Sequence, residues 1–205
     1  MSQKNKFTKA RIVILGSAGV GKTAFAVRYI TKRFIGEYDP NKETLYNHRT
    51  QLDKEEINLE ILDTANDTSE VSMESIIKHA DGFILLYAVT DIGSYRWLEK
   101  AYKMISDVRC EDHTPVVLVA NKIDLSHVRV VSQEDGLQIS KKMDAPLLEI
   151  SIAESTSGVN GAMDEVLRQA KTDFSRRTAG GRLLLGSVKR VFKKKIGRSR
   201  SDNIF

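Results

Sequence analysis

Residues 16–23 read GSAGVGKT and directly follow the apolar run RIVIL at residues 11–15. The spacing G-x-x-x-x-G-K-[ST] is typical of a loop between a strand and a helix, in which inward-turned backbone N–H groups surround a phosphate. In such a loop Lys22 contacts the β and γ phosphates, as a binding and a catalytic group, and the Thr23 hydroxyl ligates Mg²⁺. The alternative is a glycine-rich turn that binds no ligand. The predicted phosphate-binding residues are Gly16, Ser17, Ala18, Gly19, Val20, Gly21, Lys22, Thr23 and Ala24.

Length and composition are typical of one globular domain, with 205 residues and 41% apolar content. A single cysteine, Cys110, excludes a disulfide within the chain and favours a reducing compartment. The sequence contains no apolar run of the roughly 20 residues that span a bilayer, and residues 1–10 do not form a signal-peptide pattern. We therefore expect a cytoplasmic protein, with a nuclear location left open.

Charge is distributed unevenly along the chain. Residues 174–205 hold ten lysines or arginines and one acid, a net charge of +9, so the other residues carry −4 of the total +5. This asymmetry predicts a domain over residues 8–174 and a basic tail over residues 175–205. A linker is predicted at residues 176–181, where two glycines disfavour a continued helix. An amphipathic helix is predicted beyond it from the apolar spacing of Leu184, Leu185, Val188, Val191, Phe192 and Ile196.

Three kinds of partner suit this basic tail. An anionic membrane surface is preferred, ahead of a calmodulin-like groove and of nucleic acid or nuclear import. The remaining alternative is a solvated tail without a partner. Sequence-specific reading of nucleic acid is not expected, because Phe192 and Phe205 are the only aromatic residues after Phe174. The chain has neither a C-terminal CaaX cysteine nor a glycine at position 2. Attachment at the inner plasma membrane would then be peripheral, electrostatic and reversible.

Apolar runs alternate with helical patterns, which predicts an α/β fold with a mostly parallel sheet. The segment at residues 51–61 looks like two strands joined by a charged turn, so one sheet edge is predicted to be antiparallel. Six strands are predicted at Ala10–Leu15, Thr44–Leu52, Ile57–Leu62, Gly82–Val89, Pro115–Ala120 and Pro146–Ile150. Five helices are predicted at Lys22–Arg33, Glu70–His79, Ser94–Val108, Ser132–Met143 and Asn160–Phe174.

A second motif, NKID at residues 121–124, follows a predicted strand. A carboxylate at Asp124 can accept from the ring N–H and the exocyclic amine of guanine, whereas adenine presents the opposite pattern. Together with GSAGVGKT, this motif resembles the Ras superfamily of small GTPases over about residues 8–174. Within that superfamily, the sequence TKRFIGEYDP at residues 31–40 is most similar to the Ras-related estrogen-regulated growth inhibitor group. The resemblance implies a Ras-like G domain of the P-loop NTPase class, a monomer that binds GTP or GDP with Mg²⁺.

The resemblance also implies roles for further residues. Asp63, in the stretch DTA at residues 63–65, would hold a Mg²⁺-bound water, and Phe34 would pack against the guanine. The guanine is further contacted by Asn121, Lys122, Asp124, Ser151 and Ile152. Effector and regulator proteins would bind the switch loops, where Glu37, Tyr38, Asp39, Glu43 and Tyr46 form the expected surface.

Five positions depart from the family's pattern, and residues 66 and 67 act as one departure. Asn66 and Asp67 replace a glycine and the water-orienting glutamine, so Asp67 takes a catalytic position with the wrong charge. Asn41 stands where a threonine ligates Mg²⁺, and either its amide oxygen or the Thr44 hydroxyl is a candidate replacement. Ala18 would crowd an arginine finger, and Ile152 is bulky for the guanine loop.

These departures predict slow hydrolysis, at or below a rate on the order of 10⁻⁴ s⁻¹, with little response to an arginine finger. The sequence thus favours a signalling switch with slow GTP hydrolysis. The alternative is a pseudo-GTPase that holds nucleotide as a structural element and acts as a membrane or protein adaptor. A P-loop kinase acting on ATP is disfavoured by the guanine-reading motif.

Overall fold

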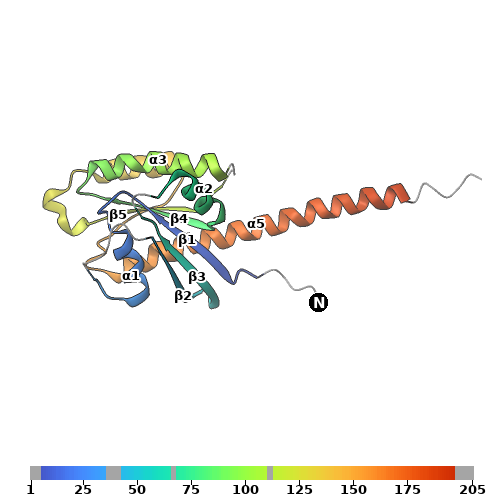
Figure 1. The fold of residues 1–205 in the computed structure, drawn as a ribbon, viewed down its shortest axis with the longest axis horizontal. Coiled ribbons are helices and arrows are strands. Elements are labelled where there is room, and N and C mark those ends of the chain that lie inside the picture. The colour runs from blue at the N-terminus through green and yellow to red at the C-terminus, as the bar shows by residue number, and fades with distance from the viewer. Residues whose placement is uncertain (1–5, 36–42, 66–67, 110–112, 197–205) are drawn as a thin grey trace, which may run out of the picture.

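The computed structural model describes residues 6–35, 43–65, 68–109 and 113–196, with side chains described as far as Ala179. These residues form an α/β fold around one six-stranded sheet in the order β2-β3-β1-β4-β5-β6 (Figure 1). The predicted fold class and the six strands are confirmed. The strands are β1 (Lys9–Leu15), β2 (Thr44–Leu52), β3 (Glu55–Asp63), β4 (Gly82–Ala88), β5 (Val116–Asn121) and β6 (Leu147–Glu149).

The sheet is parallel except at its β2 edge, where β2 and β3 pair antiparallel. Asp53 and Lys54 form the turn between them, with φ of 51° and 67°. Two successive residues with positive φ match the right-handed twist of a hairpin, so the predicted charged turn is confirmed. Every residue of β4 and β5 is buried, which explains why their apolar runs are continuous.

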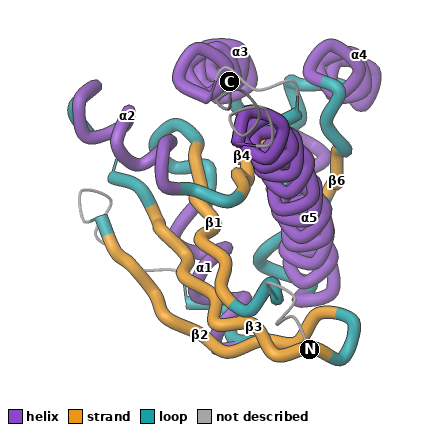
Figure 2. Tube along the Cα trace, turned by 90° about the vertical axis from the view of Figure 1, so that its right-hand side faces the viewer, coloured by secondary structure: helices purple, strands orange, loops and turns teal. Residues whose placement is uncertain are grey.

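Helices cover both faces of the sheet (Figure 2). One core lies between the sheet and two helices, α1 (Lys22–Thr31) and α5 (Thr156–Ile196). The second core packs the other face against α2 (Glu70–His79), α3 (Ile92–Arg109) and α4 (Gln133–Met143). In such folds the loops at the carboxyl ends of the parallel strands form the binding crevice.

The helices differ from the prediction in several places, by one or two residues in α1, α3 and α4 and by more elsewhere. Helix α1 ends at Thr31, because Lys32 takes a left-handed conformation with φ of 60° that closes the helix. A 3₁₀ helix, η1 (Ile123–Val128), follows β5 and was not predicted, since six residues are too few to show a helical period. Helix α5 begins at Thr156 instead of Asn160.

The predicted linker at residues 176–181 is wrong, because α5 continues through it to Ile196. Figure 1 shows this helix extending beyond the sheet. Each glycine within a helix costs only about 1 kcal/mol, which weakens a helix without ending it. The apolar stripe predicted at residues 184–196 lies beyond the described side chains. None of the helices in the described ranges is both long and apolar enough to cross a bilayer.

Candidate nucleotide-binding site

The loop between β1 and α1 has the backbone geometry that its sequence predicts. Gly19 and Gly21 adopt positive φ of 73° and 105°, a region that glycine enters without steric cost. A Cβ at Gly16 would lie 2.5 Å from the carbonyl oxygen of Leu86 on β4. The loop therefore packs directly against the sheet, and its glycines are required by its shape.

Lys22 lies across this loop. Its Nζ donates to the carbonyl oxygens of Gly16 and Ser17, at 2.9 and 3.2 Å. The side chain is buried, with a residue exposure of 7%, and this burial lowers the pKa of Lys22, an effect that the charge of Asp63 opposes. A buried ammonium held by neutral carbonyls is stabilised further by a nearby anion, which suits a phosphate.

Thr23 and Asp63 meet at the start of α1. The Thr23 hydroxyl donates to Oδ2 of Asp63 at 2.5 Å. The other carboxylate oxygen, Oδ1, is buried without a hydrogen-bond partner among the described residues. Burial raises the pKa of Asp63, against the Thr23 hydrogen bond and the charge of Lys22. An orphaned carboxylate oxygen beside a hydroxyl oxygen is a donor set that fits Mg²⁺, directly or through bound water.

Thr44, a candidate replacement for the missing magnesium ligand, lies in a strand. It is the first residue of β2, and it pairs with Asp63 across the antiparallel ladder. Because Asp63 is the residue that the resemblance places next to Mg²⁺, this register leaves Thr44 a candidate. The other candidate, Asn41, lies outside the described residues.

Asn121 joins the phosphate loop to the predicted guanine loop. Its Nδ2 donates to the Val20 carbonyl oxygen at 2.8 Å, and its Oδ1 accepts from the Ile152 N–H at 3.1 Å. Asn121 is 4% exposed, so both amide groups need these partners. In this structure Asn121 thus connects segments that lie far apart in the sequence.

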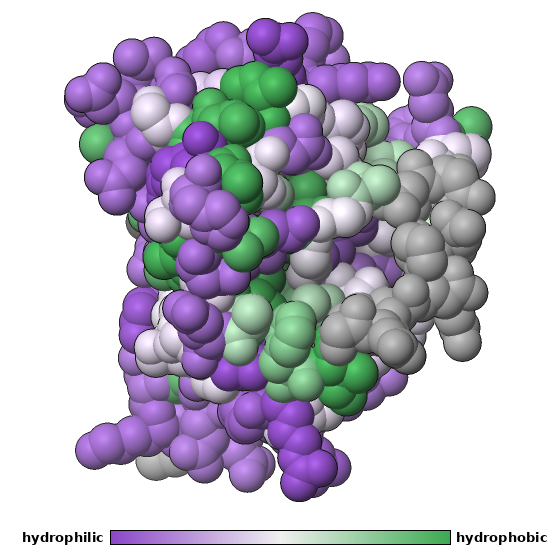
Figure 3. All heavy atoms as spheres, turned by 90° about the vertical axis from the view of Figure 1, so that its left-hand side faces the viewer, coloured by the Kyte–Doolittle hydropathy of each residue, from purple (hydrophilic) through white to green (hydrophobic). Residues whose placement is uncertain are grey.

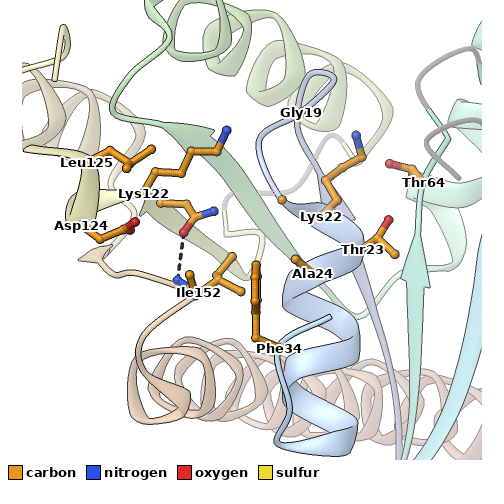
Figure 4. Close-up of a pocket in the computed structure, with 13 residues that line it drawn as sticks. Gly19, Lys22, Thr23, Ala24, Phe34, Thr64, Lys122, Asp124, Leu125 and Ile152 are labelled. Atoms are coloured by element: carbon orange, nitrogen blue, oxygen red, sulfur yellow. Dashed lines mark hydrogen bonds between the residues drawn. The ribbon is translucent and has the colours of Figure 1, made fainter. Parts of the chain in front are cut away.

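Ten of the predicted residues line one pocket of about 410 Å³. Figure 4 shows Lys22, Thr23 and Thr64 at one end and Lys122, Asp124 and Leu125 at the other, with Phe34 and Ile152 between them. Lys122 has φ of 68°, a left-handed turn that redirects the chain after β5 into η1. The lining residues are Gly19, Gly21, Lys22, Thr23, Ala24, Phe34, Thr64, Asn121, Lys122, Asp124, Leu125, Ile152 and Ala153.

Five predicted residues support the pocket without lining it. Gly16, Ser17 and Val20 provide carbonyl acceptors, Asp63 holds Thr23, and Ser151 caps the turn before α5 by accepting from the Glu154 N–H at 3.2 Å. Ala18 is exposed. Asn66 and Asp67 lie outside the described residues, as do Glu37, Tyr38 and Asp39 of the expected effector surface. Glu43 is exposed, whereas Tyr46 packs partly against the core.

Sequence reasoning did not assign three of the lining residues to the pocket. Leu125 directly follows Asp124, and the unexpected η1 places it there. Ala153 follows the predicted guanine loop. Thr64 belongs to the DTA stretch and donates to the Ile14 carbonyl oxygen at 2.9 Å. Adjacency to predicted residues was the only signal for all three.

Apolar side chains are exposed at this end of the molecule. Figure 3, which shows the left-hand side of Figure 1, presents apolar groups within a hydrophilic border. Phe34 and Leu125, two lining residues, are 47% and 37% exposed. Exposed apolar side chains at a pocket suit a flat aromatic ligand such as a nucleobase.

Comparison with known proteins agrees with the site. Residues 11–172 match the Ras family. The human Ras-related and estrogen-regulated growth inhibitor is 34% identical over 166 residues, 81% of this chain and 83% of that protein. Ras-like protein 1 of Saccharomyces cerevisiae is 37% identical over 185 residues, 89% of this chain and 60% of that protein. The mouse GTP-binding protein Rit1 is 40% identical over 144 residues, 70% of this chain and 66% of that protein. The chain belongs to the Ras family.

Proposed function

We propose that this protein is a guanine-nucleotide switch that hydrolyses GTP slowly. The observation that carries the proposal is a single pocket in which a phosphate loop and the Asp124 carboxylate lie at opposite ends. That arrangement suits a nucleotide whose phosphates contact Lys22 and whose base reaches Asp124. Family membership supports a GTPase role in signalling.

Asp124 is the proposed source of base selectivity. Its carboxylate has two acceptor oxygens, which match the two adjacent donors on the Watson–Crick edge of guanine. Asp124→Ala is therefore expected to weaken GDP binding by at least about 100-fold, because two buried donors of the base lose their acceptor. Equilibrium titration with fluorescent GDP measures this effect, and ATP titration of the unchanged protein tests the ATP-dependent alternative. Tight ATP binding would contradict guanine selectivity.

Magnesium is proposed to bind between Thr23 and Asp63. The Thr23 hydroxyl oxygen would hold it, and Asp63 would hold its water through the orphaned Oδ1. When bound, Mg²⁺ neutralises charge on the phosphates. Lys22 would contact the phosphates as well, and the glycine loop would exclude bulk water from them.

Slow hydrolysis is proposed from the sequence at residues 66 and 67. An aspartate cannot donate to a phosphate oxygen while it orients water, and it adds negative charge near an anion. Single-turnover hydrolysis tests this directly: purified protein is loaded with GTP and Mg²⁺, and bound GDP is followed by chromatography. We expect a half-life on the order of hours, and faster conversion in the Asn66→Gly/Asp67→Gln variant.

The outcomes separate the two functions. Conversion within minutes in the unchanged protein would contradict slow hydrolysis. Stable GTP in the unchanged protein, with conversion restored in the double variant, would instead support the adaptor alternative, in which nucleotide is a structural element. That alternative draws its support from Asn41, Asn66 and Asp67, all outside the described residues.

The basic tail is proposed to bind anionic membrane surfaces. Its charge of +9 over residues 174–205 supports this, because each cation near such a surface contributes about 1 kcal/mol. Sedimentation with vesicles containing phosphatidylserine is expected to retain the full chain and to release it in high salt. A variant with Lys193, Lys194 and Lys195 changed to glutamate should stay in solution. Undiminished binding of that variant would contradict the tail's role, and effector binding through the switch loops remains a separate proposal.

A further inference from the structure

A cation on α1 reaches the turn that precedes α5. Arg28 donates through Nε to the Thr156 hydroxyl at 3.1 Å, and through Nη2 to the Glu154 carbonyl oxygen at 3.3 Å. These contacts span more than 120 residues of sequence. The guanidinium therefore holds both the backbone of the turn, at Glu154, and the first residue of α5, Thr156.

A second contact repeats this one a helical turn further on. Lys32 Nζ donates to Oδ1 of Asn160 at 2.9 Å and lies 4.5 Å from the ring centroid of Tyr29. Arg28 and Lys32 are four residues apart, and so are Thr156 and Asn160. Thr156 and Asn160 share one face of α5, whereas Arg28 lies in α1 and Lys32 is the residue that closes it. This face of α5 is therefore contacted at two points by the C-terminal end of α1. We call Arg28, Lys32, Thr156 and Asn160 the α1–α5 clamp.

The clamp joins the two elements that carry the two ends of the pocket. Helix α1 begins at Lys22 directly after the phosphate loop, and α5 begins directly after the turn that holds Ile152 and Ala153. On the interior side, Asn121 already links these segments through Val20 and Ile152. The clamp provides the corresponding link on the outer side.

From this geometry we propose that Arg28 is a positioning residue that determines how long a nucleotide stays bound. The base leaves the pocket when the turn at residues 151–155 moves away from α1, and the Arg28 guanidinium resists that movement at Glu154 and Thr156. Lys32 resists the same movement through its hydrogen bond to Asn160. Lys32 lies two residues before Phe34, which lines the pocket. The inference rests on the proposed nucleotide binding.

The test is the release rate of fluorescent GDP from the full chain, measured after addition of excess unlabelled GDP. Arg28→Met is expected to accelerate release about tenfold, since two hydrogen bonds from a charged donor are lost. Thr156→Val removes one acceptor and should accelerate release about threefold. Arg28→Lys retains the charge but not the two-pronged geometry, so its rate should fall between those of the unchanged protein and Arg28→Met.

A double-variant cycle and a matched control decide the interpretation. Arg28→Met combined with Thr156→Val should release GDP no faster than Arg28→Met alone, because both remove the same contact. Arg49→Met removes an exposed cation on β2 and should leave the rate unchanged. General destabilisation would instead lower the thermal midpoint equally with and without GDP, whereas loss of positioning lowers it more with GDP present.

Each outcome bears on one proposal. Release from Arg28→Met at the unchanged rate, or rates that multiply in the double variant, would overturn the clamp. Failure of the unchanged protein to retain GDP at all would overturn the proposed function instead. Acceleration by Arg28→Met, with Arg49→Met unaffected, supports the clamp.

Discussion

The two ends of the pocket are built in different ways. The phosphate end comes mainly from eight consecutive residues, with Asp63 and Thr64 beside them. Its shape depends on backbone conformation and on close packing against β4. The base end is assembled from segments far apart in the sequence that meet through side-chain hydrogen bonds of Asn121 and Arg28. The phosphate end is therefore fixed by local sterics, whereas the base end depends on contacts between distant parts of the chain.

The sharpest test of local sterics is a pair of glycine substitutions. Gly16→Ala places a Cβ 2.5 Å from a backbone oxygen of Leu86, and we expect it to lower the free energy of unfolding by about 3 kcal/mol. Gly19→Ala meets no atom of the described residues within 4 Å and retains only the strain of φ 73°, about 1 kcal/mol. Urea unfolding of both variants measures the difference. Equal losses would show that close packing does not shape this end.

The base end is expected to lose stability when the buried side-chain amide of Asn121 is removed. Asn121→Leu keeps the volume but leaves the Val20 carbonyl and the Ile152 N–H without their partner. We expect a loss of about 2 kcal/mol in unfolding free energy, together with faster GDP release. Asn47→Leu, on the exposed side of β2, is the control for the added apolar surface. Similar values for the two variants would refute the bridging role of Asn121.

A pH-dependent ion pair gives the smallest expected effect. Arg129 donates to both carboxylate oxygens of Glu149, at 2.9 and 3.0 Å, and so ties the end of η1 to the end of β6. The Arg129 hydrogen bonds lower the pKa of Glu149, against the effect of burial. Because the folded pKa lies below the unfolded value of about 4.3, this stabilisation is present above that pH and disappears as the pH falls through the folded pKa.

Glu149→Gln is therefore expected to cost about 1 kcal/mol at pH 7 and progressively less below about pH 4. Thermal unfolding of the two proteins across that range measures the difference. Glu99→Gln, which removes an exposed partner of Lys142, should change stability much less. A Glu149→Gln penalty that stays constant down to pH 3 would contradict the linkage.

The same contrast explains what the sequence could predict. GSAGVGKT predicted the phosphate loop because its chemistry and its conformation lie in one stretch. NKID predicted a guanine-reading segment, yet the two hydrogen bonds of Asn121 depend on where Val20 and Ile152 fold. Leu125 could not be assigned without η1, and Arg28 could not be paired with residues more than 120 positions away. The linker prediction at residues 176–181 is wrong for another reason: its two glycines weaken a helix locally, but α5 is long enough to continue through them.

Helix α5 also has a mechanical consequence. It starts at Thr156 beside the base-contacting turn, and about 22 Å further along Lys171 forms ion pairs with Asp53 and Glu55 at the β2–β3 turn, at 3.2 and 3.1 Å. One continuous helix thus links the wall of the pocket to the turn of the β2–β3 hairpin. A pulling force applied to the C-terminal end of α5 would be transmitted along the helix axis to the turn at residues 151–155. The same force would act on the β2–β3 hairpin through the ion pairs of Lys171.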